Sequence, residues 1–351
     1  MNRGQRLGLS PRGRLVGIVM GGLLGVGASA PVAWAQDVAA PVPPPEVAQF
    51  EEIVPGSGEG IKIGFTQLIL GVPFPDALQG GMEAAAETAG AELITCDSKM
   101  DAAQALNCAR QFATQEVDVL VTFQADAAAA ANICAEGPRV PVIAIDIEQQ
   151  PCQTTFVGAA NAYAGEIVGA ELGKYFRDNF DCKYDAWISL ESTAVGIVND
   201  QRMGGMRDAF ADYCGEVQNL RIIDTGAGGQ ADAAQRQMTD TLTALPGAEH
   251  VIVVGINEDV ITAALAAART QDRTDNLYLG VQNFDPDNCQ IWTAPGFVAT
   301  AAYFPERYAE LIIPAAIRLA RGEEVPPKIL VPHVAVTPAN MMTIYPETAC
   351  Q

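Results

Sequence analysis

Short apolar runs alternate with alanine-rich stretches of helical periodicity from Ile61 onward. Apolar, β-branched runs bounded by turn residues predict buried strands, and the longer stretches between them predict helices. In the first half, strands are predicted over Ile61–Thr66, Glu92–Asp97, Val117–Phe123 and Val140–Ile145, with helices over 76–89, 101–115 and 127–134. In the second half, strands are predicted over 184–190, 220–224, 250–255, 277–281 and 297–302, with helices over 161–179, 201–213, 231–245 and 258–269.

Buried strands that alternate with helices form parallel sheets with helices on both faces. The scheme runs twice, and about 290 residues are more than one hydrophobic core usually holds. The pattern therefore predicts an α/β fold of two doubly wound parallel-sheet lobes. Segments 118–124 and 250–257 each consist of an apolar strand and a terminal amide side chain, and a helix follows each of them. Ligands gather beyond the carboxyl ends of such strands, so we expect Gln124 and Asn257 near a binding site.

The first 60 residues lack this alternation. Four arginines precede an apolar stretch from Leu15, which closes on Ala33-Trp34-Ala35. This order predicts a signal peptide over 1–35, cleaved before Gln36. A retained membrane anchor is the alternative, and Pro31 disfavours it by breaking the stretch short of a ~20-residue span. Residues 36–60 are rich in proline and then glycine, which predicts a linker without a core of its own.

Charge and cysteine content fit an exported chain. The sequence has 21 basic and 42 acidic residues, and loss of the four leader arginines leaves 17 basic residues, a net charge of −25. Such an acidic chain is unsuited to nucleic acid or an anionic membrane surface. No cysteine precedes Cys96, so none lies near the cleavage site to carry a lipid. We expect a soluble, monomeric periplasmic protein.

Eight cysteines in an exported protein favour disulfides, although 105 pairings are possible in principle. Pairing between neighbours along the chain is the simplest arrangement. A zinc site is the weaker alternative, because no two cysteines have the C-x-x-C spacing. The expected disulfides are Cys96–Cys108, Cys134–Cys152, Cys182–Cys214 and Cys289–Cys350.

Sequence signals for catalysis or a cofactor are weak. The only two histidines, His250 and His333, lie in apolar runs and are interpreted as structural. Segment 226–231 fits a dinucleotide-binding pattern, G-x-G-x-x-A. Asp240, the acid at the required distance, falls within a predicted helix and not at a strand end. We interpret the segment as a turn and expect no enzyme activity, cofactor or metal.

Five motifs follow one another along the chain: Pro73-Phe74, the Val140–Asp146 strand, Gly158–Gly165, Arg202–Met206, and Asn257-Glu258-Asp259. Together they resemble type I periplasmic solute-binding proteins, in particular the ribose- and galactose-binding branch of sugar transport, with Ala160 in place of an acid of the family. They occur in the family's order and spacing, and the resemblance runs from about Ile61 to Val336.

The resemblance implies two lobes joined by three crossover strands, near 158–161, 300–304 and 330–334, that close over one ligand. The implied first lobe comprises 61–159 and 304–333, and the second comprises 160–303 and 334–351. The implied function is capture of a sugar or another small polar molecule and its delivery to the permease of an ABC importer. A sensory subunit for a histidine kinase or chemoreceptor is the alternative. DNA-binding repressors share the lobes, but the leader excludes them.

The resemblance also implies the roles of individual side chains. Phe74 would pack on a sugar face, Asp146 would accept hydrogen bonds from hydroxyls, and Arg202 and Asn257 would bind hydroxyls. Each has a structural alternative: core packing for Phe74, an ion pair between Asp146 and Arg202, and a helix cap for Asn257.

The chain also departs from the family pattern. Gln282 stands where an acid is usual, Tyr303 where glutamine is frequent, and Ile147 where arginine is frequent. Segment 226–229 lacks the usual aromatic residue, and the loop over 67–72 is more apolar. We therefore expect Gln282 and Tyr303 to line a site less charged than a ribose site, for a different sugar, a polyol or another polar metabolite.

Overall fold

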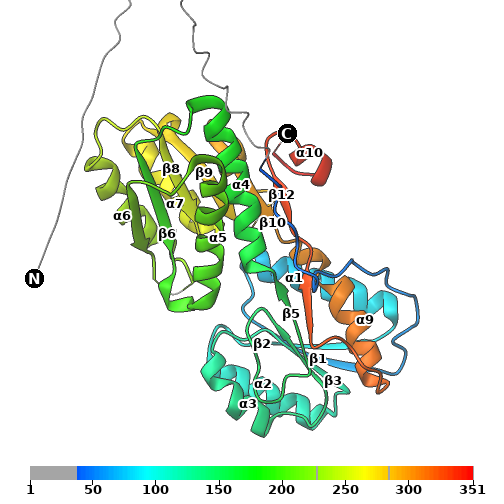
Figure 1. The fold of residues 1–351 in the computed structure, drawn as a ribbon. Coiled ribbons are helices and arrows are strands. Elements are labelled where there is room, and N and C mark those ends of the chain that lie inside the picture. Colours follow the sequence, from blue (N-terminus) through cyan, green and yellow to red (C-terminus); the bar gives the residue numbers. More distant parts are fainter. Residues whose placement is uncertain (1–37, 227, 284, 351) are drawn as a thin grey trace, which may run out of the picture. The chain divides into compact units, whose positions relative to one another are not determined.

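Two six-stranded sheets organise the computed structural model, which describes residues 38–350 apart from 227 and 284. The expected signal peptide lies outside these residues. In Figure 1 each sheet belongs to its own lobe and is flanked by helices. No helix in the described part of the chain combines the length and the apolar character needed to span a membrane.

The first lobe takes its elements from both ends of the chain. Its strands are β1 (Lys62–Gln67), β2 (Glu92–Asp97), β3 (Val119–Thr122), β4 (Val142–Ile145), β5 (Thr155–Ala159) and β11 (Lys328–Val331). Its helices are α1 (Pro73–Ala89), α2 (Ala102–Gln115), α3 (Ala130–Glu136) and α9 (Ala309–Ala320), with short 3₁₀ turns at Ala127–Ala129 and Pro305–Arg307.

The second lobe repeats the scheme. Its strands are β6 (Ala186–Glu191), β7 (Leu220–Asp224), β8 (Val251–Gly255), β9 (Leu277–Gln282), β10 (Phe297–Ala302) and β12 (Val334–Val336). Its helices are α4 (Asn161–Phe180), α5 (Ile197–Cys214), α6 (Ala231–Thr243), α7 (Glu258–Thr270), α8 (Cys289–Trp292) and α10 (Met341–Ile344), with 3₁₀ turns at Thr193–Val195 and Thr274–Asn276.

The strand orders confirm the predicted fold class. They are β11-β5-β4-β3-β1-β2 and β12-β10-β9-β8-β6-β7, and every pairing between these strands is parallel except that of β12 with β10. Every residue of β3, β4 and β8 is buried, as expected for strands covered on both faces. The chain passes between the sheets three times: from β5 to α4, from β10 to the turn at Pro305, and from β11 to β12.

Helices α4 and α5 approach closely because glycines line their contact. A Cβ atom at Gly165 would lie 2.3 Å from the carbonyl oxygen of Arg202, and one at Gly169 would lie 2.2 Å from that of Met206. Only a residue without a side chain fits at such a distance. We call this contact of Gly165 and Gly169 with the α5 backbone the glycine seam. It brings the second turn of α5, which carries Arg202, against the start of α4.

The segment expected to be a free linker instead packs on the first lobe from Glu46 onward. The Ala48 amide donates to the Leu330 carbonyl (2.9 Å), which extends the sheet by one bridge next to β11. Glu51 forms a two-pronged ion pair with Arg318 at 2.9 Å, and the Phe50 ring packs edge-on against Phe304. Proline and glycine set the local stiffness of this segment, but its apolar and charged side chains determine where it binds.

All four expected disulfides are present. The Cα atoms of Cys96–Cys108 and Cys134–Cys152 are 5.7 and 5.5 Å apart, and those of Cys182–Cys214 and Cys289–Cys350 are 5.2 and 5.1 Å apart. These distances are ordinary for a bridged pair. Cys182–Cys214 joins the C-terminal ends of α4 and α5, so it fastens the outer end of the glycine seam.

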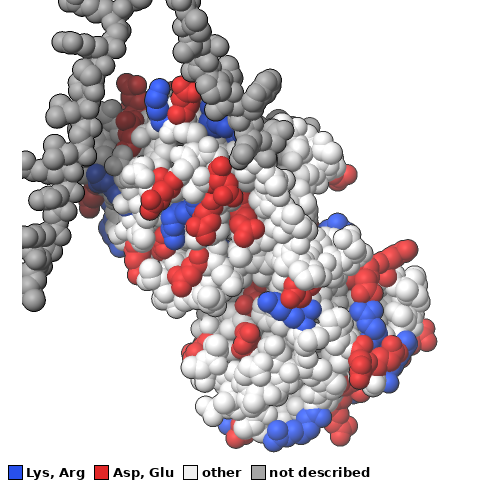
Figure 2. All heavy atoms as spheres, viewed as in Figure 1, with Lys and Arg blue, Asp and Glu red and all other residues white. Residues whose placement is uncertain are grey.

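Charged side chains are dispersed over the surface. On the face drawn in Figure 2, lysines and arginines lie among acidic side chains and do not form a continuous basic stripe over the described residues. This distribution agrees with the acidic composition of the chain.

The glycine seam predicts opposite effects for two Gly→Ala substitutions. Gly169→Ala forces a methyl group against the α5 backbone and should lower the free energy of unfolding by about 1–3 kcal/mol. Gly204→Ala, also in this helix pair, meets no atom within 4 Å, and should raise it by roughly 0.5–1 kcal/mol through helix propensity. Urea denaturation of both variants measures the difference. Equal stabilities would contradict the close approach of the helices.

Candidate functional site

Asp146 follows β4 and marks the first-lobe side of the candidate site. Its backbone is left-handed (φ 53°), which turns the side chain back toward β5, and its Oδ1 accepts a hydrogen bond from the Ala159 amide at 2.9 Å. Burial raises the pKa of Asp146 from 3.8 to about 6, although the Ala159 hydrogen bond, the charge of Arg202 and the Tyr308 hydroxyl oppose the rise. The carboxylate is therefore held in a partly desolvated position.

Arg202 provides the positive charge from the second lobe. Its Nε donates to Asn161 Oδ1 at 2.7 Å and its Nη1 to the Ile256 carbonyl at 3.2 Å. The guanidinium carbon lies 4.9 Å from the centre of the Tyr303 ring, within range of a cation–π interaction. These contacts fix the plane of the guanidinium at the first crossover and beside β8.

Tyr303 and Gln282 form a neutral pair beneath Arg202. The Tyr303 hydroxyl donates to Gln282 Oε1 at 2.6 Å, and Gln282 Nε2 donates to the Ala164 carbonyl at 3.1 Å. Both side chains are buried, and burial raises the pKa of Tyr303 to about 12, so the phenol stays neutral. This part of the site carries no acid, as the departures at these two positions predicted.

Phe74 begins an aromatic group beside these polar residues. Its ring packs edge-on against Phe123 (6.4 Å between centroids) and Tyr308 (5.7 Å). It also contacts the apolar cores of both lobes and remains half-buried. Because Tyr308 interacts with Asp146, the aromatic group adjoins the carboxylate.

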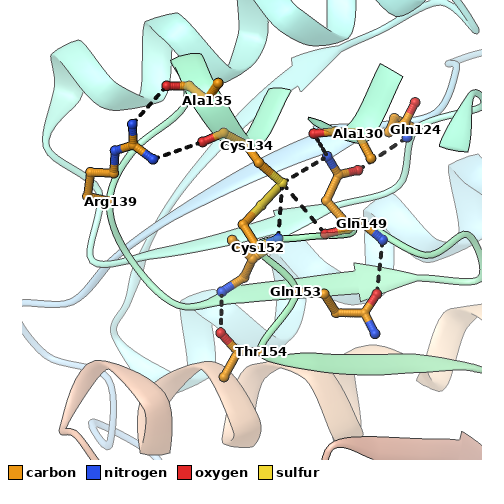
Figure 3. Close-up of a disulfide and its surroundings, with 10 residues drawn as sticks. Gln124, Ala130, Cys134, Ala135, Arg139, Gln149, Cys152, Gln153 and Thr154 are labelled. Carbon is orange, nitrogen blue, oxygen red and sulfur yellow. Dashed lines mark hydrogen bonds between the residues drawn. A yellow bond between two sulfur atoms is a disulfide. The ribbon is translucent and has the colours of Figure 1, made fainter. Parts of the chain in front are cut away.

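Gln124 belongs to a network beneath the loop that follows Asp146. Its Nε2 donates to the Asp126 carbonyl at 2.8 Å and to Gln149 Oε1 at 3.2 Å, while its Oε1 accepts from the Asp126 amide. Figure 3 shows Gln149 between Gln124 and the Cys134–Cys152 disulfide, with its Nε2 bonded to the Ala130 carbonyl. The Gln124 amide is 1% exposed and thus supports the loop rather than presenting free donors.

Asn257 adopts the helix-capping role given as its alternative. Its Oδ1 accepts from the Val260 amide at 3.2 Å at the start of α7. Its Nδ2 donates to the Gly228 carbonyl at 2.8 Å. It therefore fixes the turn between β7 and α6, the segment with the dinucleotide-like pattern, against the strand that ends beside Arg202.

Three of the seven expected residues, Arg202, Gln282 and Tyr303, form one connected group, and Asp146 lies within electrostatic range of it. Phe74 adjoins it through Tyr308, whereas Gln124 and Asn257 brace neighbouring loops. Asn161 and Tyr308 were not expected. Asn161 lies in the G-x-x-N motif that carried the resemblance and could have been found there, but no sequence signal pointed to Tyr308. The described residues contain no cluster of three or more His, Cys, Asp or Glu side chains able to hold a metal ion.

Comparison with known protein families shows to which family the chain belongs. The family model for a periplasmic binding protein domain matches residues 63–324. The chain belongs to this family. Its members are binding proteins of the periplasm. The ribose import binding protein of Escherichia coli is 22% identical over 259 residues, which are 73% of this chain and 83% of that protein.

Solved structures of the family agree with the fold. An ABC transporter solute-binding protein from Mycobacterium smegmatis with bound glycerol has a TM-score of 0.68 and 26% identity, over 81% of this chain and 96% of that one. A solute-binding protein from Bacillus halodurans with bound myo-inositol has a TM-score of 0.66 and 18% identity, over 82% and 98%. The second likeness concerns the fold alone.

The raised pKa of Asp146 predicts a pH-dependent effect of Asp146→Asn. Between about pH 4 and 6 the folded chain binds more protons than the unfolded chain at this position, so this carboxyl destabilises the fold increasingly as pH rises. Asparagine keeps an acceptor for the Ala159 amide and does not titrate. The stability of the variant relative to wild type should therefore increase from pH 4 to pH 7, as measured by urea denaturation.

Glu136→Gln, in an exposed ion pair with Arg110, is the control for Asp146→Asn. A relative stability of Asp146→Asn that does not change with pH would show that the carboxyl is not desolvated.

Proposed function

We propose that this chain is a periplasmic solute-binding protein that captures a sugar or sugar-like small polar molecule between its lobes and delivers it to an ABC importer. The observation that carries the proposal is the placement of Asp146 from the first lobe within electrostatic range of Arg202 from the second, beside the aromatic group around Phe74. Charged groups from both lobes at one place can couple ligand binding to the relative position of the lobes. The names of the E. coli and M. smegmatis proteins support the ligand class and the importer.

The chemistry of these residues suits an uncharged, hydroxyl-rich ligand. Each hydroxyl both donates and accepts, so a carboxylate and a guanidinium on opposite sides serve its two functions. The aromatic group offers a surface for the C–H face of a ring. Asp146 balances the charge of Arg202, and the Gln282–Tyr303 pair is neutral, so the site has no excess charge that would favour an ionic ligand.

The proposal includes the location and state of the protein. The leader over 1–35 would be cleaved, and the mature chain would act as a soluble monomer in the periplasm, without a lipid anchor. It would bind and release its ligand unchanged, in keeping with a family of binding proteins.

A thermal-shift screen with D-ribose, D-allose, D-galactose, myo-inositol and glycerol tests the ligand class. A compound that binds only the folded state, present at about 100 times its dissociation constant, should add about 2.7 kcal/mol to the free energy of unfolding. If no sugar or polyol raises the midpoint, the proposed ligand class is wrong.

The role of Arg202 can be tested with whichever compound binds. Arg202→Met keeps a long unbranched side chain beside Tyr303 but removes the charged donors, and it should weaken binding roughly 10- to 100-fold. Arg110→Met removes an arginine from the exposed pair with Glu136 and should leave affinity unchanged. Isothermal titration measures both. Unaltered affinity in Arg202→Met would place the site elsewhere.

A further inference from the structure

His333 contacts all three crossovers. It lies on the third, between β11 and β12, and is 5% exposed. Its Nε2 accepts a hydrogen bond from the Ala160 amide of the first crossover at 2.9 Å. Its Nδ1 lies 3.2 Å from the Ala302 carbonyl at the end of β10, where the second crossover begins.

These two contacts determine the tautomer of the imidazole. An amide N–H can only donate, so Nε2 must be unprotonated, and a carbonyl can only accept, so Nδ1 must carry the hydrogen. Burial lowers the pKa of His333 to about 3, and the charge of Arg202 acts in the same direction. The ring is therefore neutral, with one acceptor and one donor matched to two different crossovers.

The same ring contacts the candidate site. Its centroid lies 4.5 Å from that of Tyr303, at an interplanar angle of 54°. Tyr303 in turn lies beneath Arg202 and donates to Gln282. His333 thus packs against the same aromatic ring that the guanidinium contacts. Ala160 is the N-cap residue of α4 and makes no side-chain capping bond. Because its amide donates to His333, the imidazole also connects the start of that helix to the third crossover.

We propose that His333 is a positioning residue for ligand capture: its imidazole joins the three crossovers and holds Tyr303 under Arg202. The proposal rests on the proposed function for its link to binding. The junction itself does not depend on any ligand. Because each crossover is held through a different atom or face of one ring, loss of the ring should loosen the crossovers together and leave the cores of the lobes intact.

Two measurements without ligand test the junction. In His250→Gln protein, His333 is the only histidine, and its ¹⁵N imidazole spectrum should show a protonated Nδ1 and a bare Nε2 that do not titrate between pH 5 and 8. In His333→Phe, hydrogen exchange should become roughly ten-fold faster at the Ala160 amide, with β3 and β8 unchanged. His333→Gln, which can still accept from Ala160, should keep most of that protection.

Binding supplies the third measurement. For any compound of the sugar panel that binds wild type, His333→Phe should weaken affinity roughly ten-fold, and His333→Gln should weaken it less. A titrating imidazole, a protonated Nε2, or unchanged exchange and affinity in a folded His333→Phe protein would each overturn the proposal. If His333→Phe does not fold, the ring spectrum of His250→Gln and the exchange rates of His333→Gln still decide the matter. If no compound binds wild type, the sugar function fails, while the spectrum and the exchange rates still test the junction.

Discussion

The close approach of α4 and α5 is the constraint on which the candidate site depends. Where Gly165 faces the carbonyl of Arg202, a side chain of any size would separate the two helices. With the helices in contact, the Arg202 side chain reaches Asn161 at the start of α4 and the carbonyl at the end of β8. Backbone packing in the second lobe thus places the charge that faces Asp146 of the first lobe.

Electrostatics in this region follow from limited access to water. Desolvation raises the pKa of Asp146 and lowers that of His333, so both groups favour the neutral form more than they would in solution. Around the Arg202 guanidinium lie the Asn161 amide oxygen, the Ile256 carbonyl and the Tyr303 ring, and the Asp146 carboxyl acts on it through its charge. An uncharged ligand with several hydroxyls would disturb this balance least.

Much of the fold could be predicted because most of its strands are short and apolar. The pattern did not predict β5, β11, β12, α8, α9 or α10. Strand β5 is only five residues long and includes Thr155 and Gly158, and helix α9 contains Pro314, so neither has a clear periodic signal. The disulfides were accessible because each joins cysteines that are neighbours along the chain.

The site was only partly predictable. Position at a strand end brought Asp146 into consideration and a motif of the resemblance brought Arg202, but neither could show that Gln124 and Asn257 use their amides on nearby backbone. Such local bonds depend on loop conformation, which residue spacing does not encode. His333 was interpreted as structural, and its contacts with Ala160 and Ala302 bridge 173 and 31 residues. Only the folded chain brings those groups together.

We propose that one small polar ligand joins the two lobes. Small-angle X-ray scattering of the protein, with and without the sugar that gives the largest thermal shift, measures this. Saturating sugar should decrease the radius of gyration, and Arg202→Met protein at the same sugar concentration should keep its unliganded value. Tight binding with an unchanged scattering curve would contradict the proposal, because the ligand would then occupy one lobe without engaging both Asp146 and Arg202.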